Sequence, residues 1–231
     1  MLTIANMQMN MIVQGAGCSE TYPMDEKTKE LAMKFMQKEE ENTPRPGKFP
    51  LALPESQERM AAALLGTYGS VVKGRDMDFQ MDDATIQKVE KVVKWMYESR
   101  KRGLLLCGTL GNGKTTMLRA MKYLFGTRAV YVEAQGVYDY FKQNRSIPSI
   151  SPKDILLIDD MGVEPAACND FGDVRYPLTE LLMSRYKTNS TTVITTNSTF
   201  DEIGETYGAR IQDRMREMYG LIKYVEPSYR K

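Results

Sequence analysis

The chain has 231 residues, of which 42% are hydrophobic and 26% are charged, a composition typical of a globular protein with one substantial core. Its 31 basic and 30 acidic residues give a net charge of +1, which excludes a global electrostatic attraction to nucleic acid or to an anionic membrane. The sequence contains no histidine, which excludes every mechanism that needs an imidazole base or an imidazole metal ligand.

Cysteine usage and hydropathy indicate the compartment. Cys18, Cys107 and Cys168 are odd in number and far apart, so we expect neither a disulfide framework nor a zinc site. No stretch approaches the roughly 18 uninterrupted apolar residues of a membrane span, and the first residues lack the pattern of a secretory signal. We therefore predict a cytoplasmic protein with no membrane partner.

Residues 1–75 are predicted to form an N-terminal arm with short helices and a proline-rich linker, a candidate partner-binding segment. Residues 1–24 show no helical or strand period, and residues 25–41 suit either a short charged helix or a solvated tether. The apolar run Met60 to Leu65 predicts a helix that ends near Gly66. The linker prolines are Pro44, Pro46, Pro50 and Pro54.

Residues 76–231 are predicted to form an α/β domain. From Asp82 to Arg100, apolar residues recur every three or four positions, which predicts an amphipathic helix. Five β-rich segments follow, separated by stretches long enough for helices, and this alternation predicts a mostly parallel five-stranded sheet flanked by helices. The segments are Leu104–Cys107, Ala129–Glu133, Ile155–Asp159, Thr192–Thr196 and Leu221–Val225.

A glycine-rich loop follows the first of these segments. The run GTLGNGKT opens a helical stretch, so strand, loop and helix stand in the order that a phosphate-binding loop requires. Glycines let backbone amides approach phosphate oxygens, Lys114 adds a full positive charge, and Thr115 offers a hydroxyl to Mg²⁺. We therefore predict ATP and Mg²⁺ as cofactors. The expected nucleotide contacts are Gly108, Gly111, Asn112, Gly113, Lys114, Thr115 and Thr116.

Two carboxylates end the third β-rich segment, ILLIDD. We expect Asp159 to join Thr115 in the magnesium shell and Asp160 to polarise the attacking water; the alternative is that both cap the strand end. Asp160 is shorter than a glutamate, which favours slow hydrolysis. Glu164, four residues further on, is a possible substitute base.

The next segment, TTVITTN, ends in Asn197. This side chain either orients water near a γ-phosphate or caps the strand, and the segment alone favours neither interpretation. Residues 161–177 are punctuated by glycine and proline, which predicts a long loop able to reach nucleotide, DNA or a neighbouring subunit.

Together, GTLGNGKT, ILLIDDMG, TTVITTN and the tail YGARIQDRMREMYG…SYRK resemble the bacterial DnaC/DnaI-like helicase-loader ATPases of the AAA+ superfamily, a branch related to IstB-like transposition helper ATPases. The resemblance spans residues 79–231. It implies a P-loop NTPase fold of AAA+ type, strand order 5-1-4-3-2, and no complete C-terminal lid. The sensor arginine of such a lid would be replaced only in part, by Arg230.

The same resemblance implies a nucleotide site completed by an arginine of the neighbouring subunit. That role falls on Arg210, with Arg214 as the fallback, and these arginines are therefore expected on the partner side of the site. Without the resemblance, both would be interpreted as pairing with nearby acidic residues on a helix surface.

The implied partners are a second copy of the chain, a replicative helicase, or both, together with single-stranded DNA. Basic and aromatic residues suit stacking on bases, although a solvated helix face explains them equally well. They are Tyr138, Tyr140, Phe141, Lys142, Arg145 and Lys153. The predicted function is a helicase-loading ATPase. The alternatives are a transposition helper acting on duplex DNA and an ATP-gated binding module with little turnover; a small-molecule kinase is disfavoured by Asn197 and the arginine-bearing tail.

Overall fold

A computed structural model describes residues 49–79, 81–170 and 172–225. The expected arm of residues 1–24, the expected helix over 25–41, Pro44, Pro46 and Arg230 lie outside the described residues. The helices are α3 (Gln57–Lys73), α4 (Asp83–Glu98), α5 (Lys114–Phe125), α6 (Ala134–Asn144), α7 (Pro177–Lys187), α8 (Phe200–Tyr207) and α9 (Ala209–Met218). The strands are β1 (Gly103–Gly108), β2 (Ala129–Glu133), β3 (Ile155–Met161), β4 (Cys168–Asp170), β5 (Asp173–Arg175), β6 (Thr192–Thr196) and β7 (Tyr219–Tyr224).

Five strands form one sheet in the order β2-β3-β6-β1-β7, and every neighbouring pair runs parallel. Numbered along the chain without the small hairpin, this is the expected order 5-1-4-3-2, so the predicted five-stranded parallel α/β fold is confirmed. All strands end at the same edge, and the polar residues that follow β1, β3 and β6 therefore meet there.

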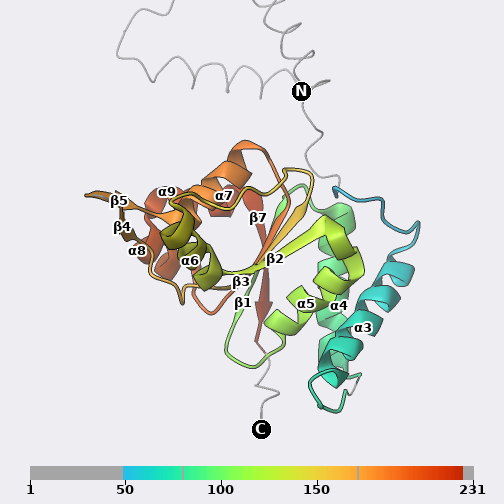
Figure 1. Ribbon diagram of the computed structural model, residues 1–231. Helices are drawn as coiled ribbons and strands as arrows, with labels where there is room; N and C mark the ends of the chain where they lie inside the picture. Colours follow the sequence, from blue (N-terminus) through green and yellow to red (C-terminus); the bar gives the residue numbers. More distant parts are fainter. Residues whose placement is uncertain (1–48, 80, 171, 226–231) are drawn as a thin grey trace, which may run out of the picture. The chain divides into compact units, whose positions relative to one another are not determined.

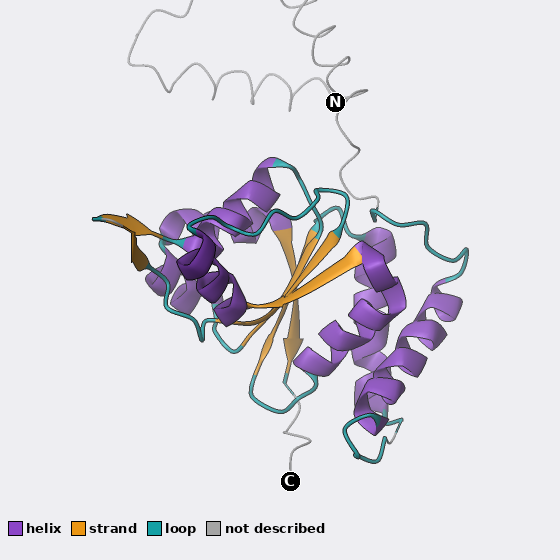
Figure 2. Cartoon of the chain, viewed as in Figure 1, coloured by secondary structure: helices purple, strands orange, loops and turns teal. Residues whose placement is uncertain are grey.

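Helices cover both faces of the sheet (Figure 1). Leu104 and Leu106 of β1 face a core shared with α3, α4 and α5, whereas Leu105 faces a second core shared with α7, α8 and α9. This alternation follows from the two-residue period of a strand, and burial on both sides explains why these strands are continuous aliphatic runs. Figure 2 shows the resulting three layers, with the sheet between the two sets of helices.

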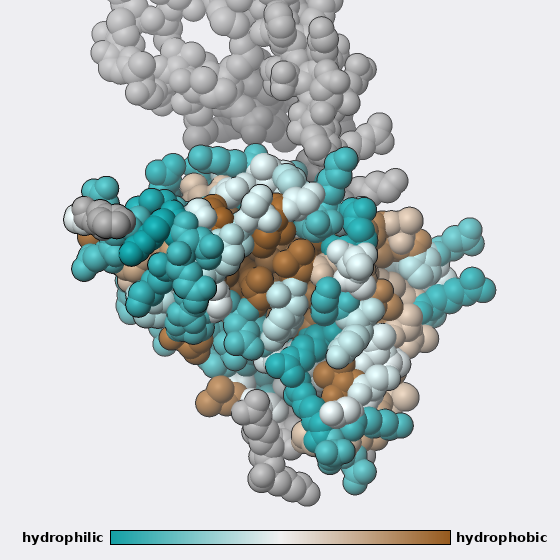
Figure 3. Space-filling model, viewed as in Figure 1, coloured by the Kyte–Doolittle hydropathy of each residue, from teal (hydrophilic) through white to brown (hydrophobic). Residues whose placement is uncertain are grey.

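The edge strand β2 is less covered than the central strands. Val130, Tyr131 and Val132 are half-buried, whereas all five residues of β6 are buried. In Figure 3, apolar surface is visible in the hollow between the α5 side and the α6 side of this face. Tyr131 is therefore half-buried, and it lies on the strand next to β3, which carries Asp159.

Two elements differ from the sequence prediction. Helix α3 continues past Gly66 and Gly69 to Lys73. Gly69 makes room for the ring of Phe79 and does not end the helix: a Cβ there would lie 2.9 Å from that ring. Met60, Leu64, Tyr68 and Val71 of α3 belong to the same core as β1, α4 and α5, so α3 packs as part of the domain that carries the sheet, and the expected boundary at residues 75/76 falls inside this domain.

The second difference lies in the expected long loop after β3. Its middle folds into the antiparallel hairpin β4–β5, which projects from the α6 and α8 side of the sheet (Figure 1). Among the described helices, none is long and apolar enough to cross a membrane.

Candidate functional site

The glycine-rich loop between β1 and α5 has the backbone of an anion cradle. Gly108, Gly111 and Gly113 all have positive φ angles, of 153°, 80° and 94°. A Cβ on Gly108 would collide with the carbonyl oxygen of Tyr224, and one on Gly113 would collide with the hydroxyl of Tyr68. No side chain caps α5 and no acidic residue lies in its first turn, so its N-terminal amides are directed at the loop without a local anion.

Lys114 lies across the mouth of this loop. Its Nζ donates to the carbonyl oxygens of Gly108 and Thr109 at 2.7 and 2.8 Å, and to Asn197 Oδ1 at 2.8 Å. The predicted phosphate lysine and the predicted polar residue after β6 are therefore brought together. All these acceptors except Asn197 belong to the loop itself, so the ammonium is held at the position where phosphate oxygens would enter.

The apex of the loop is anchored from two sides. Asn112 is fully buried, and its Nδ2 donates to the carbonyl oxygen of Tyr224 at 2.9 Å. Lys88 of α4, also buried, donates to the Asn112 carbonyl oxygen at 3.2 Å. The sequence analysis missed Lys88, because helical spacing places it among surface lysines and only the fold turns it toward the loop.

The carboxyl end of β3 places Asp159 against Thr115, as predicted. Asp159 Oδ1 accepts hydrogen bonds from Thr115 at 3.1 Å and from Thr195 at 2.5 Å, and its Oδ2 accepts one from Tyr131 at 2.6 Å. Burial of the ring, together with this hydrogen bond, raises the pKa of Tyr131, so its hydroxyl stays protonated as a donor.

The hydroxyl of Thr115 and the carboxylate of Asp159 are hard oxygen ligands of the kind that Mg²⁺ prefers. Among the described residues there is no group of three or more His, Cys, Asp or Glu side chains that could hold a metal. This donor set therefore suits a cation that completes its shell with water and phosphate oxygens, as Mg²⁺ does in nucleotide sites.

Asp160 follows Asp159 where β3 becomes irregular. Its φ angle is 55°, at a register shift between β3 and β6, and its backbone N–H donates to Thr195 Oγ1 at 2.9 Å. Asp160 and Asn197 both line the cavity that contains the phosphate loop. The structure thus places the predicted water-polarising group and the predicted water-orienting group at one end of one cavity.

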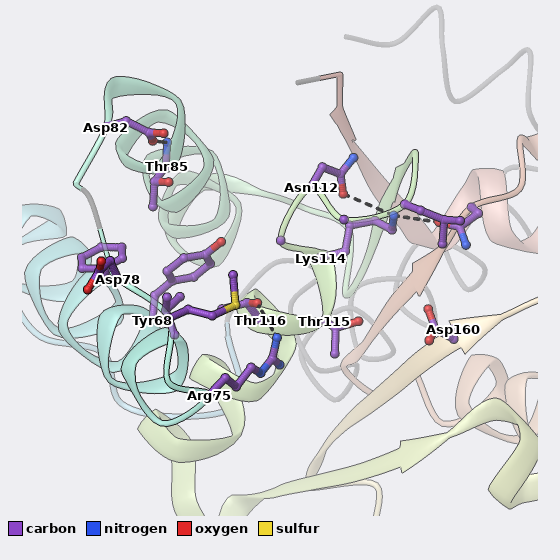
Figure 4. A pocket seen from close by; sticks show the side chains of 17 residues that line it. Tyr68, Arg75, Asp78, Asp82, Thr85, Asn112, Lys114, Thr115, Thr116 and Asp160 are labelled. Atoms are coloured by element: carbon purple, nitrogen blue, oxygen red, sulfur yellow. Dashed lines mark hydrogen bonds between the residues drawn. The ribbon is translucent and has the colours of Figure 1, made fainter. Parts of the chain in front are cut away.

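This cavity has a volume of about 520 Å³ and extends from Asn197 past the loop to α3 (Figure 4). The far end comes from α3, the segment that joins it to α4 and the first turn of α4, none of which the sequence analysis assigned to the site. These lining residues are Tyr68, Val72, Arg75, Met77, Asp78, Phe79, Asp82 and Thr85. The apolar and aromatic members offer a surface of the kind that a nucleotide base needs.

Glu164, the expected substitute base, is not at the cavity. It is 5% exposed, accepts a hydrogen bond from the backbone N–H of Gly162 at 3.0 Å, and accepts another from the hydroxyl of Tyr207. Burial and this carboxylate raise the pKa of Tyr207. Glu164 therefore fixes the segment after β3 against α8, and the expectation that it serves as a base is wrong for this geometry.

The two tail arginines differ in their surroundings. Arg214 pairs with Glu217 at 2.9 Å, hydrogen-bonds the hydroxyl of Tyr186 at 3.0 Å and stacks on that ring. Arg210 is exposed on α9 and, within the described part of the chain, makes neither an ion pair nor a hydrogen bond. It does not line the cavity of its own chain. The helix-pairing interpretation thus fits Arg214, whereas Arg210 is exposed and makes no such pair among the described residues.

The expected basic and aromatic DNA-contacting set is only partly on the surface. Phe141 is fully buried with Arg175 over its ring, because the helical period of α6 turns it inward with Val137. Arg145 pairs with Asp170 of β4 at 3.0 Å. Tyr140 remains 41% exposed. Phe141 is therefore excluded as a stacking residue, and Arg145 is engaged with the hairpin.

A known protein family matches most of this chain. The family described as "IstB-like ATP binding protein" matches residues 56–231, which include α3 and every element of the sheet. The chain belongs to this family. ATP binding is the property that the family description states, and it agrees with the phosphate loop and cavity described above.

Three solved structures are similar to this chain. DnaI is 20% identical over 70% of this chain and 93% of its own, with a TM-score of 0.47. AMPPCP-bound DnaA from Aquifex aeolicus is 17% identical over 63% of this chain and 48% of its own, with a TM-score of 0.43. Domain III of DnaA from Thermotoga maritima is 13% identical over 80% and 69%, with a TM-score of 0.40. No curated protein matches this member of the family significantly in sequence.

Proposed function

We propose that this chain is an ATPase that hydrolyses ATP to ADP and phosphate with Mg²⁺ in a self-assembled state, and that it loads a replicative helicase on DNA. The observation that carries the proposal is that Lys114, Asn197 and Asp160 line a single cavity, in which Thr115 also lies and is hydrogen-bonded to the buried Asp159. Phosphoryl transfer to water depends on positioning and charge rather than on an imidazole, so a site without histidine can carry it out.

The roles follow from the contacts. Thr115 and Asp159 would hold Mg²⁺, which supplies positive charge to the β- and γ-phosphates. Lys114 pairs with the same phosphates when it exchanges neutral carbonyl acceptors for charged oxygens. Asp160 and Asn197 orient the water whose oxygen attacks the γ-phosphorus; the bond to the β–γ bridging oxygen breaks, and the water proton passes to Asp160. Its short side chain favours slow turnover.

Arg210 completes this site in trans. It lies outside its own cavity and has no partner within the described part of the chain, so an assembly in which α9 of one copy faces the loop of the next would place it at the γ-phosphate. An arginine at that position offsets the negative charge that develops in the transition state.

A transposition helper acting on duplex DNA is the second candidate, because the matching family is the IstB-like one. Its site would be the same, so DNA form separates the two. Turnover that rises more than linearly with protein concentration, and further with single-stranded DNA, supports loading. Stimulation by duplex alone supports the transposition role, and tight ATP binding without turnover supports an ATP-gated switch.

Complementation tests the trans site. Lys114→Ala should abolish ATP binding, and Arg210→Ala should preserve binding but lower kcat by roughly two orders of magnitude or more. A mixture of the two variants regains turnover, because some interfaces combine an intact loop with an intact arginine. Arg216→Ala is the matched control, since Arg216 lies on the same helix and pairs with Asp201 of its own chain at 3.1 Å. A mixture no more active than its components would refute the trans role.

A further inference from the structure

The cavity contains an arginine to which the sequence analysis gave no role. Arg75 follows the last turn of α3, and its backbone is fixed by the turn: its N–H donates to the carbonyl oxygen of Val72 at 3.0 Å, and the next N–H donates to that of Lys73 at 3.0 Å. Its side chain crosses to the phosphate loop, where Nη1 donates to Thr116 Oγ1 at 3.3 Å. Among the described residues, Arg75 makes no ion pair.

Because Arg75 is hydrogen-bonded to Thr116, the position of Thr116 indicates which part of a bound nucleotide Arg75 would face. Lys114, Thr115 and Thr116 open α5, and their amides are the orphan donors that bind phosphate oxygens. Lys114 and Thr115 turn toward Asn197 and Asp159, where the γ-phosphate and Mg²⁺ belong in the proposed function. Thr116 turns the other way, toward α3 (Figure 4).

The cavity therefore has a linear order. It begins at Lys114, which is hydrogen-bonded to Asn197, passes Thr115, then Thr116 with Arg75, and ends at Tyr68 of α3. A nucleoside triphosphate has the same order: γ-phosphate, β-phosphate, α-phosphate, then ribose and base. The guanidinium of Arg75 corresponds to the α-phosphate.

We infer that Arg75 binds the α-phosphate of the nucleotide, which it reaches by exchanging the neutral hydroxyl of Thr116 for a charged oxygen. The bond to a phosphate oxygen adds a Coulomb attraction between opposite charges that the bond to a neutral hydroxyl lacks, and no ion pair within the described residues has to be broken. Asp78 lines the same part of the cavity, so Arg75 also offsets a carboxylate that would otherwise repel the phosphate. The inference rests on the proposed placement of the nucleotide.

The role of Arg75 can be tested with ligands that differ in their phosphates. The α-phosphate is common to AMP, ADP and ATP and is absent from adenosine. Loss of Arg75 should therefore weaken the three nucleotides by one common factor and leave adenosine unchanged. The Lys114 side chain, in contrast, faces the β- and γ-phosphates, so its loss should affect ATP and ADP far more than AMP.

Competition binding against a fluorescent ADP analogue tests this with Arg75→Met, Arg75→Lys and the control Lys73→Met. Lys73 is an exposed cation in the last turn of α3 and does not line the cavity, so its loss matches the change in charge. Circular dichroism and thermal unfolding check that each variant is folded; because Arg75 is exposed, we expect unchanged unfolding.

Arg75→Met should weaken AMP, ADP and ATP about tenfold each, the size expected for one partly exposed hydrogen bond to a charged group. Arg75→Lys should recover part of the loss, and Lys73→Met should bind like the wild type. No loss, a loss confined to ATP, or an equal loss for adenosine would each overturn the inference. Failure of the proposed function looks different: the wild type would then not bind ATP, or Lys114→Ala would bind it normally.

Discussion

Replacing Glu164 with glutamine separates a structural carboxylate from a catalytic one. In the native chain the buried carboxylate accepts hydrogen bonds from both the backbone N–H of Gly162 and the hydroxyl of Tyr207. A glutamine carbonyl oxygen can keep the bond to Tyr207, but its NH₂ group then faces the N–H of Gly162, and two donors meet. Loss of one bond to a charged, buried acceptor costs about 2 kcal/mol.

For a domain of this size, 2 kcal/mol corresponds to a fall in Tm of about 4–8 °C. We expect Glu164→Gln to show this fall in thermal unfolding while kcat changes less than about threefold, because the side chain does not line the cavity. Asp160→Asn is the counterpart, with unchanged stability and lost turnover. Glu205→Gln, an exposed carboxylate on α8, is the control. If Glu164→Gln abolished turnover without lowering Tm, the reasoning would be refuted, and Glu164 would be the base.

Two further substitutions test the packing around the site. Tyr131→Phe removes the 2.6 Å hydrogen bond to Asp159 and should lower the free energy of unfolding by about 1.5 kcal/mol, measured in urea, while Tyr123→Phe, which alters an exposed ring, should not. Phe141→Ala should lower that free energy by about 3–5 kcal/mol, because the ring is fully buried, whereas Tyr140→Ala should leave it within about 0.5 kcal/mol. A Phe141→Ala variant that kept full stability but lost DNA binding would contradict the structural placement of this ring.

The sheet and the phosphate end of the site could be predicted from sequence because their determinants are local. Each central strand is an aliphatic run ended by polar residues, and parallel pairing brings those ends to one edge. The loop between β1 and α5 carries its own glycines, lysine and hydroxyl within a single short segment. Asp159, Asn197 and Lys114 then meet without any further information.

The end of the cavity that α3 forms could not be predicted from sequence, because it depends on contacts between distant parts of the chain. Arg75 and Thr116 are 41 residues apart, and nothing near Arg75 marks it as a ligand. The helix was predicted to end near Gly66, although it continues past Gly69, where the ring of Phe79 packs. Glu164 followed two catalytic-type aspartates in sequence, but its partner Tyr207 is 43 residues away.

The two ends of the cavity also differ in what they connect to. The phosphate end is anchored in the sheet, whereas the base end belongs to α3, a 17-residue helix whose preceding segment is held by a hydrogen bond from Tyr97 to the carbonyl oxygen of Pro54 at 2.7 Å. A nucleotide that contacts both ends stabilises α3 against α5. By thermodynamic linkage, a partner that displaces α3 must weaken nucleotide binding by the same factor by which nucleotide opposes that partner.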